Sequence, residues 1–401
     1  MKKLLSCILT GVLAFGILPI FSYAAEADYS RFEGQGISLN VYNWGEYISN
    51  GEDDSLDVNA EFEERTGIKV NYTNFASNEE LYAKLKSGGT SYDVIIPSDY
   101  MIAKLIAEDM LEKLNFENIP NFEYIDERFK NPEYDPANEY SVPYMWGVVG
   151  IIYNTSLVDE EEAQSWDILW DSRYIKDILM FSNSRDAFGI ALKRLGYSFN
   201  TTDPEQLNEA ADSLKEQKAL VQAYVMDEIF DKMTGGEAAL APYYAGDFLT
   251  MSEDNPDLAF AIPKEGTNRF VDAVCIPKGS KQKEAAETYI NFLCETEIAL
   301  ANCEYIGYST PHAMAYEKLD EETRNNLVAY PGDEVLANTE TFVNLPDEAS
   351  ELVKNLWTQV ISTNTGDNKW AVPVLLLLAI AASVAINLWR RHKKKRDEAL
   401  Y

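Results

Sequence analysis

Histidine and cysteine are scarce in this chain of 401 residues, which has two histidines and four cysteines. Once a predicted signal peptide is removed, Cys275, Cys294 and Cys303 remain. An odd number of cysteines is not the pattern of a disulfide framework, so we expect at most one disulfide and, more simply, free buried thiols. GxSxG, HExxH, CxxC and phosphate-loop motifs are absent. His312 is the one candidate for histidine-based catalysis, and we therefore predict no enzyme, no metal site and no cofactor.

Basic residues are also few relative to acidic ones. The chain has 34 lysines and arginines against 66 aspartates and glutamates, which gives a formal net charge of -32. This balance argues against nucleic acid and against an anionic lipid surface as partners. It is compatible with a cationic ligand, although an acidic surface more commonly serves solubility. Apolar residues make up 46% of the chain, so we expect a large core, and the length is enough for two domains.

One long apolar run lies near the start of the chain. Two lysines precede the run at 4–21, and Ser22-Tyr23-Ala24 has the small-residue spacing of a cleavage signal. This pattern predicts a signal peptide over residues 1–24 and therefore an exported protein. A polar lead-in follows over residues 25–36.

A second apolar run, 370–389, lies near the C-terminus and contains no charged residue. Twenty helical residues span about 30 Å, the thickness of one hydrocarbon core. Tryptophan stands at both ends of the run, and a basic block follows it. We predict a linker over 364–369, a single transmembrane helix over 370–389 in the cell membrane, and a basic cytoplasmic tail over 390–401, with the binding domain outside. A buried core helix is the alternative, which the basic block disfavours.

Between these ends, the hydrophobic pattern alternates between strands and helices. Strands are predicted from residue 37 and at 68–72, 92–96, 178–181, 258–262 and 269–277, and helices at 54–66, 77–88, 101–114, 187–195, 203–223 and 283–294. The βαβα order at the start predicts an α/β fold with a mainly parallel sheet. Ligands of such sheets bind at the carboxyl ends of the strands, where residues 44–47 and 98–100 fall.

The first of these strand ends has the sequence Tyr42-Asn43-Trp44-Gly45-Glu46-Tyr47. It combines three aromatic rings with a flexible glycine and a carboxylate. Because an aromatic face attracts an ammonium ion and a carboxylate neutralises it, this stretch suits an organic cation. The alternative interpretation is that its aromatic residues belong to an ordinary core.

Several stretches in this order resemble one protein family. They are residues 42–47, Tyr92-Asp93-Val94-Ile95-Ile96-Pro97-Ser98, Ser141-Val142-Pro143-Tyr144-Met145-Trp146-Gly147, and the segments 165–170, 185–188 and 306–311. Over about 37–345 the chain is similar to the substrate-binding proteins of polyamine (spermidine/putrescine) ABC transporters. The resemblance implies a two-lobed α/β fold of the type II periplasmic-binding-protein kind, with a ligand cleft between the lobes. Lobe 1 would comprise 37–142 and 271–308, and lobe 2 would comprise 143–270 and 309–363.

The resemblance also implies a set of ligand-binding residues. A linear polyamine carries an ammonium at each end, so its site needs an anionic clamp for each end and an aromatic tunnel between them. The implied clamps are Asp186, Asp247 and Asp272. The implied tunnel comprises Trp44, Tyr47, Tyr100, Tyr244, Phe270 and Tyr308. Glu46, Ser98 and Asn183 complete the predicted site.

Some positions depart from the family pattern. Asn183 stands where spermidine-binding relatives have a carboxylate, and Asp186 where they have the longer glutamate. Tyr244 and Phe270 replace tryptophan, and Gly45 replaces a hydroxyl residue. Asp247 instead resembles the putrescine-binding branch, so the choice between putrescine and spermidine stays open.

Other interpretations of these residues remain. Asp272 could form a structural salt bridge, Asp186 could cap its helix, and Asp247 could be a turn residue. The pair Tyr243-Tyr244 is similar to the tyrosines that hold ferric iron in related two-lobed proteins, which makes iron an alternative ligand. A membrane-tethered polyamine sensor is a further alternative, but the tail is too short for a signalling domain. We expect a monomer that delivers its ligand to a membrane permease driven by a separate ATPase.

Overall fold

The computed structural model describes residues 29–89 and 91–363. Within these residues no helix combines the length and the apolarity that a membrane span requires. The predicted signal peptide at 1–24 and the predicted transmembrane helix at 370–389, with its linker and tail, lie outside the described residues.

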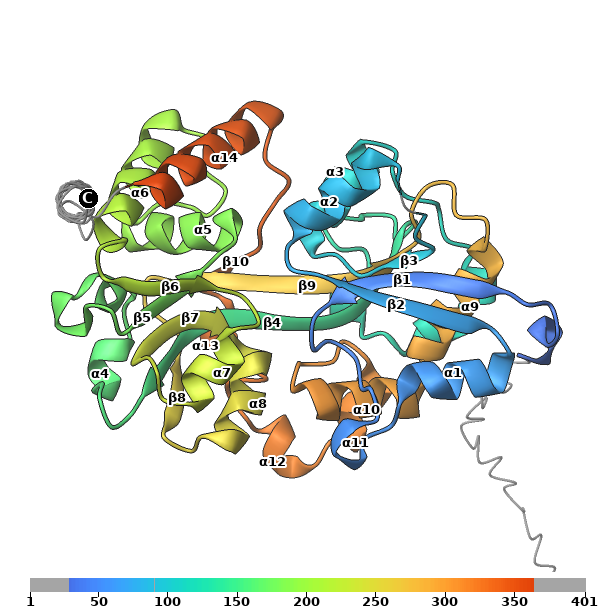
Figure 1. Ribbon diagram of the computed structural model, residues 1–401. Coiled ribbons are helices and arrows are strands. Elements are labelled where there is room, and N and C mark those ends of the chain that lie inside the picture. Colours follow the sequence, from blue (N-terminus) through green and yellow to red (C-terminus); the bar gives the residue numbers. More distant parts are fainter. Residues whose placement is uncertain (1–28, 90, 364–401) are drawn as a thin grey trace, which may run out of the picture.

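The backbone of the fold is one mixed sheet (Figure 1). Its strands are β1 (Ser38–Trp44), β2 (Lys69–Phe75), β3 (Val94–Ile95), β4 (Ser141–Asn154), β5 (Ile178–Phe181), β6 (Val221–Val225), β7 (Leu240–Tyr244), β8 (Leu258–Ala261), β9 (Thr267–Cys275) and β10 (Thr339–Glu340). In the described chain they form a ten-stranded sheet in the order β2-β1-β3-β9-β4-β7-β5-β6, with β10 beside β9 and β8 beside β4. β1 is parallel to β2 and β3, and β5 is parallel to β6 and β7.

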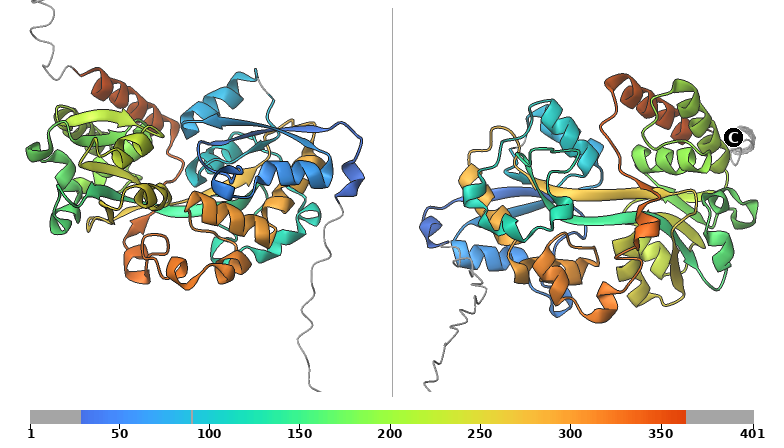
Figure 2. Two further views of the ribbon diagram at one scale, coloured as in Figure 1. Left: turned by 60° about the horizontal axis from the view of Figure 1, so that its bottom comes forward. Right: turned by 180° about the vertical axis from the view of Figure 1, so that it is seen from behind.

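Two long antiparallel strands, β4 and β9, run side by side through the middle of the molecule (Figure 2). β9 pairs with β3 at one end, and β4 pairs with β7 and β8 at the other. All of β4 is buried, which explains its continuous apolar sequence. β4 and β9 therefore join two α/β halves into one continuous sheet.

Helices cover both faces of each half. The helices are α1 (Val58–Thr66), α2 (Asn78–Ser87), α3 (Asp99–Ala107), α4 (Glu160–Ala163), α5 (Ser184–Arg194), α6 (Pro204–Gln217), α7 (Ile229–Thr234), α8 (Ala245–Asp254), α9 (Lys283–Leu293), α10 (Thr296–Ile306), α11 (Ala313–Lys318), α12 (Glu321–Arg324), α13 (Asp333–Leu336) and α14 (Asp347–Ser362). Short 3-10 helices lie at Ser30–Phe32, Glu52–Asp54, Phe116–Asn118, Pro120–Tyr124, Glu127–Phe129, Trp166–Trp170 and Ser172–Tyr174. We call β1 to β3 with α1 to α3 and α9 to α11 the first half, and β5 to β8 with α4 to α8 and α14 the second half.

Local sequence signals explain where the helices begin and end. Ser77 caps α2 by accepting a hydrogen bond from the backbone N–H of Glu80, as the predicted capping box requires. α1 ends at Gly67, whose φ of 72° is the left-handed conformation that glycine adopts without strain. The N-cap of α11 is His312, whose Nδ1 accepts a hydrogen bond from the N–H of Ala315, so this buried histidine has a structural role.

Several predicted elements agree with the structure, and others need correction. The strands beginning near 37, 68, 92, 178 and 258 and the helices at 187–195 and 283–294 are confirmed. The predicted helix 203–223 is wrong in its last part, because α6 ends at Gln217 and residues 221–225 form β6. The predicted helix 101–114 ends early, since Asp109 takes a left-handed φ of 53° just beyond α3. Residues 54–57 precede α1, and Asp54 has a φ of 62°.

The predicted lobe boundaries stay a prediction. The boundary at 142/143 would fall within the continuous strand β4, and α11, which was assigned to lobe 2, packs on α10. All three remaining cysteines are buried and free, as predicted.

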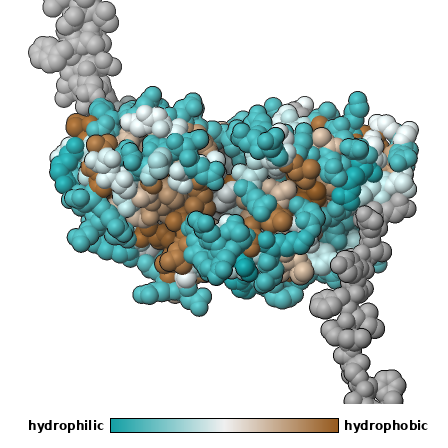
Figure 3. Space-filling model, turned by 90° about the horizontal axis from the view of Figure 1, so that it is seen from below, coloured by the Kyte–Doolittle hydropathy of each residue, from teal (hydrophilic) through white to brown (hydrophobic). Residues whose placement is uncertain are grey.

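The surface and the core divide along the expected lines. Leu39, Val41 and Ile151 are among many fully buried apolar residues of one core that extends through both halves. On the face shown in Figure 3, hydrophilic residues form most of the outline and apolar residues gather nearer the middle. The core thus follows the shared sheet, and the acidic residues lie mainly outside it.

A pair of isoleucines tests this assignment of the core. Ile151 of β4 is 0% exposed, and Ile175 is 55% exposed. We expect Ile151→Ala to lower the free energy of unfolding by about 2–5 kcal/mol, because it leaves a cavity, and Ile175→Ala to change it by less than about 0.5 kcal/mol. Urea unfolding followed by circular dichroism measures both, and equal losses would contradict the placement of β4 in the core.

Candidate functional site

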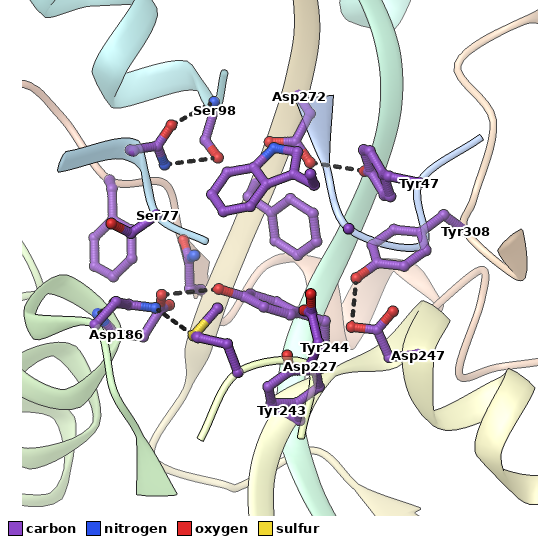
Figure 4. A pocket seen from close by; sticks show the side chains of 18 of the residues that line it. Tyr47, Ser77, Ser98, Asp186, Asp227, Tyr243, Tyr244, Asp247, Asp272 and Tyr308 are labelled. Atoms are coloured by element: carbon purple, nitrogen blue, oxygen red, sulfur yellow. Dashed lines mark hydrogen bonds between the residues drawn. The ribbon is translucent and has the colours of Figure 1, made fainter. Parts of the chain in front are cut away.

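A cavity with an empty volume of about 720 Å³ lies where the two halves meet (Figure 4). Eleven of the twelve predicted site residues line it: Trp44, Tyr47, Ser98, Tyr100, Asn183, Asp186, Tyr244, Asp247, Phe270, Asp272 and Tyr308. The twelfth, Glu46, instead lines a neighbouring acidic hollow. The structure therefore brings together almost all of the residues that the sequence pattern selected.

The first half contributes residues from strand ends and helix starts. Trp44 ends β1, and its ring packs at 4.5 Å from that of Phe75. Ser98 is the N-cap of α3, where its hydroxyl accepts a hydrogen bond from Asn78 at 3.1 Å. In the first turn of α3, the hydroxyl of Tyr100 donates to a carboxylate oxygen of Glu79. The residues of this wall thus lie at, or just after, the carboxyl ends of parallel strands.

The second half contributes two acidic residues from the first turns of helices. Asn183 is the N-cap of α5, and its Oδ1 accepts a hydrogen bond from the N–H of Asp186. The carboxylate of Asp186 accepts a hydrogen bond from Tyr244 at 3.0 Å. Because Asn183 is the cap, the alternative role of Asp186 as a helix cap is wrong. Asp247 lies in the first turn of α8 and accepts a hydrogen bond from Tyr308 at 2.9 Å.

Strand β9 places a third carboxylate in the wall. Asp272 is 4% exposed, and its Oδ2 accepts a hydrogen bond from Tyr47 at 2.7 Å. Its Oδ1 is buried without a hydrogen-bond partner in the described chain. No lysine, arginine or histidine of the described chain forms an ion pair with it, so the alternative of a structural salt bridge is not supported.

Aromatic rings connect these carboxylates. The ring of Tyr244 lies 5.3 Å from that of Phe270, and Phe270 lies 6.2 Å from Tyr308. Tyr47 then meets Tyr308 edge-on at 4.8 Å. Such edge-to-face contacts hold the rings in fixed orientations around the cavity.

The described lining of the cavity contains acidic residues without basic ones. Among the described residues that line it, none is lysine or arginine. Burial raises the pKa of Asp272 and of Asp186 to about 6, and that of Asp247 to about 8. Burial also raises the pKa of Asp99 to about 8, although its carboxylate accepts hydrogen bonds from two backbone N–H groups. A cationic ligand would supply the positive charge that these groups lack.

Arg185 is the nearest buried cation, but it is held by other groups. Its guanidinium donates to the carbonyl oxygens of Phe199 and Val343 and to Oδ1 of Asn200. It also lies 4.5 Å from the centre of the Phe342 ring. Arg185 therefore anchors the segment that carries Phe342 to the cavity wall and does not itself line the cavity.

Ten lining residues were not predicted as part of the polyamine site. They are Ser77, Asn78, Glu79, Asp99, Met226, Asp227, Phe230, Tyr243, Asn268 and Phe342. Residues 77–79 follow β2, so the strand-end rule could have selected them. Met226 and Asp227 follow β6, which the predicted helix 203–223 concealed. Phe342 lies far along the chain, and no local pattern marks it.

Tyr243, which suggested ferric iron, also lines the cavity. Its ring stacks on Phe181 at 5.2 Å, and burial raises the pKa of both Tyr243 and Tyr244 well above the usual range. Iron binding needs phenolates, which burial disfavours here. In the described part of the chain, no group of three or more histidine, cysteine or acidic residues is placed to hold a metal ion.

The chain is similar to known transport proteins. The family model for bacterial extracellular solute-binding proteins matches residues 58–328. The chain belongs to this family. Over 330 residues it is 35% identical to the spermidine/putrescine-binding periplasmic protein of Escherichia coli. The aligned region covers 82% of this chain and 91% of that relative.

Two further relatives extend the comparison. The putrescine-binding periplasmic protein SpuD of Pseudomonas aeruginosa is 30% identical over 342 residues, covering 81% of this chain and 92% of SpuD. The crystal structure of a spermidine/putrescine ABC transporter substrate-binding protein from Streptococcus pneumoniae has a TM-score of 0.68 and 38% identity, over 82% of this chain and 99% of that chain. The predicted resemblance and the predicted periplasmic-binding-protein fold are confirmed, and the relatives are transport proteins rather than enzymes.

The buried carboxylates predict how stability depends on pH without ligand. A carboxyl whose pKa is higher in the folded chain than its unfolded value of about 3.9 favours folding when protonated. The contribution of Asp272 is therefore full below about pH 4 and is lost as the pH rises through its folded pKa of about 6. We expect the melting temperature to fall from about pH 4 to about pH 7 more steeply in the wild type than in Asp272→Asn.

Differential scanning calorimetry of the ligand-free protein measures this slope. Asp257→Asn is the matched control, because Asp257 is exposed and lies outside the cavity. Its slope should equal that of the wild type. Equal slopes in the wild type and Asp272→Asn would contradict the assigned pKa.

Proposed function

We propose that this protein binds a linear polyamine, putrescine or spermidine, outside the cytoplasmic membrane and delivers it to an ABC importer. One observation carries the proposal: the cavity combines several separate carboxylates with an aromatic wall and has no lysine or arginine among its described lining residues. The names of the relatives from Escherichia coli and Pseudomonas aeruginosa support the same ligand class.

The chemistry of a polyamine matches this arrangement. Asp186 and Asp247 lie on opposite sides of the pocket, and Asp272 comes from the strand behind them (Figure 4). Each contact between an ammonium and an aromatic face contributes about 0.5–2 kcal/mol. Charge-assisted hydrogen bonds to carboxylates are stronger, provided that every buried charge is paired. The methylene groups between the ammonium ions would lie along the rings of Trp44 and Phe270.

Binding is coupled to closure of the two halves. Tyr308 follows α10 in the first half, and its hydroxyl reaches Asp247 in the second half. Its ring also lies against Gly246, where an added Cβ would be 2.1 Å from Cδ2 of Tyr308. A ligand that touches both walls favours this closed arrangement because it binds the closed state more tightly than the open one. The closed form then docks, as a monomer, on a permease that a separate ATPase drives.

Calorimetric titration tests the ligand class directly. The protein is stripped of bound ligand by unfolding and refolding and is titrated with putrescine, cadaverine, spermidine and spermine, and separately with ferric citrate. We expect one-to-one binding of a polyamine. Asp272→Asn should weaken it by about 100-fold or more, because a charge-assisted hydrogen bond is lost in a dry site.

The exposed substitution Asp257→Asn again serves as the control and should leave the affinity unchanged. Absence of binding to all four amines would overturn the proposal. A visible tyrosinate–iron colour with ferric citrate would instead favour the iron alternative.

The membrane tether belongs to this proposal as well. The uncharged run 370–389, followed by the basic block, would hold the binding domain beside its permease with the tail in the cytoplasm. We expect the full chain to stay with membranes after a carbonate wash and a chain ending at residue 363 to be released in soluble form. Cell fractionation measures the difference. Release of the full chain would show that the run does not anchor it.

A further inference from the structure

Asp227 occupies a special position at the mouth of the cavity. It lies two residues beyond the end of β6 and, like Asp247 and Phe230, lines both the polyamine cavity and the neighbouring hollow. That hollow has an empty volume of about 1700 Å³, and Glu46, Asp231, Glu253 and Glu304 also line it. Asp227 therefore lies, with Asp247, where the cavity meets a wider acidic space.

The Asp227 carboxylate fits this place because residue 45 is glycine. A Cβ added to Gly45 would lie 2.2 Å from Oδ2 of Asp227, which is far inside contact distance. The acidic side chain from the second half thus fills the space that any side chain at position 45 of the first half would take. In the part of the chain that the structure describes, this carboxylate has no hydrogen-bond or ion-pair partner.

The acidic groups follow one another through the cavity. Burial and then the charge of Asp186 raise the pKa of Asp272, so these two groups are electrostatic neighbours. Burial, together with the negative charges of Asp227, Glu46 and Asp272, raises the pKa of Asp247 to about 8. The inner carboxylates are held by tyrosine hydroxyls, whereas Asp227 is not.

We propose that Asp227 anchors an additional cationic nitrogen at the cavity mouth, so that the site favours linear polyamines with three or more amines over diamines. This inference rests on the proposed polyamine function and adds the selection of ligand length. A diamine has two charges, which the inner carboxylates Asp186 and Asp272 suffice to pair. A longer ligand brings its last ammonium to Asp227.

Titration calorimetry of the full exported chain, purified in mild detergent and stripped of ligand, tests the inference with putrescine, spermidine and spermine. We expect Asp227→Asn to lower the affinity for spermidine and spermine about fivefold or more. The affinity for putrescine should fall by less than about twofold. Asp231→Asn is the matched control, because it removes the same charge from the same hollow but does not line the cavity. It should leave all three affinities within about twofold.

A second variant moves the carboxylate without removing it. Gly45→Ala should displace the Asp227 side chain and selectively lower the affinity for the longer amines. The double variant Gly45→Ala/Asp227→Asn should bind them no more weakly than the weaker-binding single variant does. Equal losses for all three amines, or equal behaviour of Asp227→Asn and Asp231→Asn, would overturn the inference while leaving polyamine binding intact. If the wild type bound none of the amines, the proposed function itself would fail.

Discussion

Burial of carboxylates in a wall whose described residues include no lysine or arginine is the constraint on which the site depends. An ionised carboxylate that leaves water loses hydration free energy, and the cavity wall supplies no lysine or arginine to offset that loss. Tyrosine hydroxyls satisfy one oxygen of each main carboxylate, in the pairs Tyr47–Asp272, Tyr244–Asp186 and Tyr308–Asp247. They orient the negative charge but do not neutralise it, which leaves that task to a cationic ligand.

The fold determines where such groups can lie. Asp99, Asp186 and Asp247 each occupy the first turn of a helix that directly follows a strand. Helix N-termini favour negative charge through their free N–H groups and their dipole. Three such junctions, from α3, α5 and α8, converge on one cavity because β4 and β9 hold the two halves against each other. The same topology that builds the sheet thus reduces the cost of burying acids at its strand ends.

The sequence was sufficient for the wall residues that follow recognisable strands. The alternation of apolar residues predicts the strands whose ends carry Trp44 and Ser98. The family resemblance selects Asp186 and Tyr308. Neither signal selects Asp227. Residues 218–223 continue the helical pattern of α6, whereas pairing with β5 makes residues 221–225 a strand. The family resemblance placed Glu46 in the site, yet its φ of 45° accompanies a turn that places it in the neighbouring hollow. Local pattern specifies elements, whereas contacts between distant segments decide which side chains share a cavity.

The unpaired charge also explains how binding can drive closure. Protons and ammonium ions compete for the same carboxylate oxygens. Acid therefore weakens a polyamine complex, but it stabilises the ligand-free protein because it protonates the buried carboxylates. The free energy that the ligand-free fold loses to repulsion among its acids becomes available when the ligand pairs them. Because Asp247 meets Tyr308 and Asp227 meets Gly45 across the boundary between the halves, pairing is strongest when the halves are closed. Ligand recognition and closure therefore draw on one electrostatic imbalance, and removing it by substitution would stabilise the protein at the expense of its function.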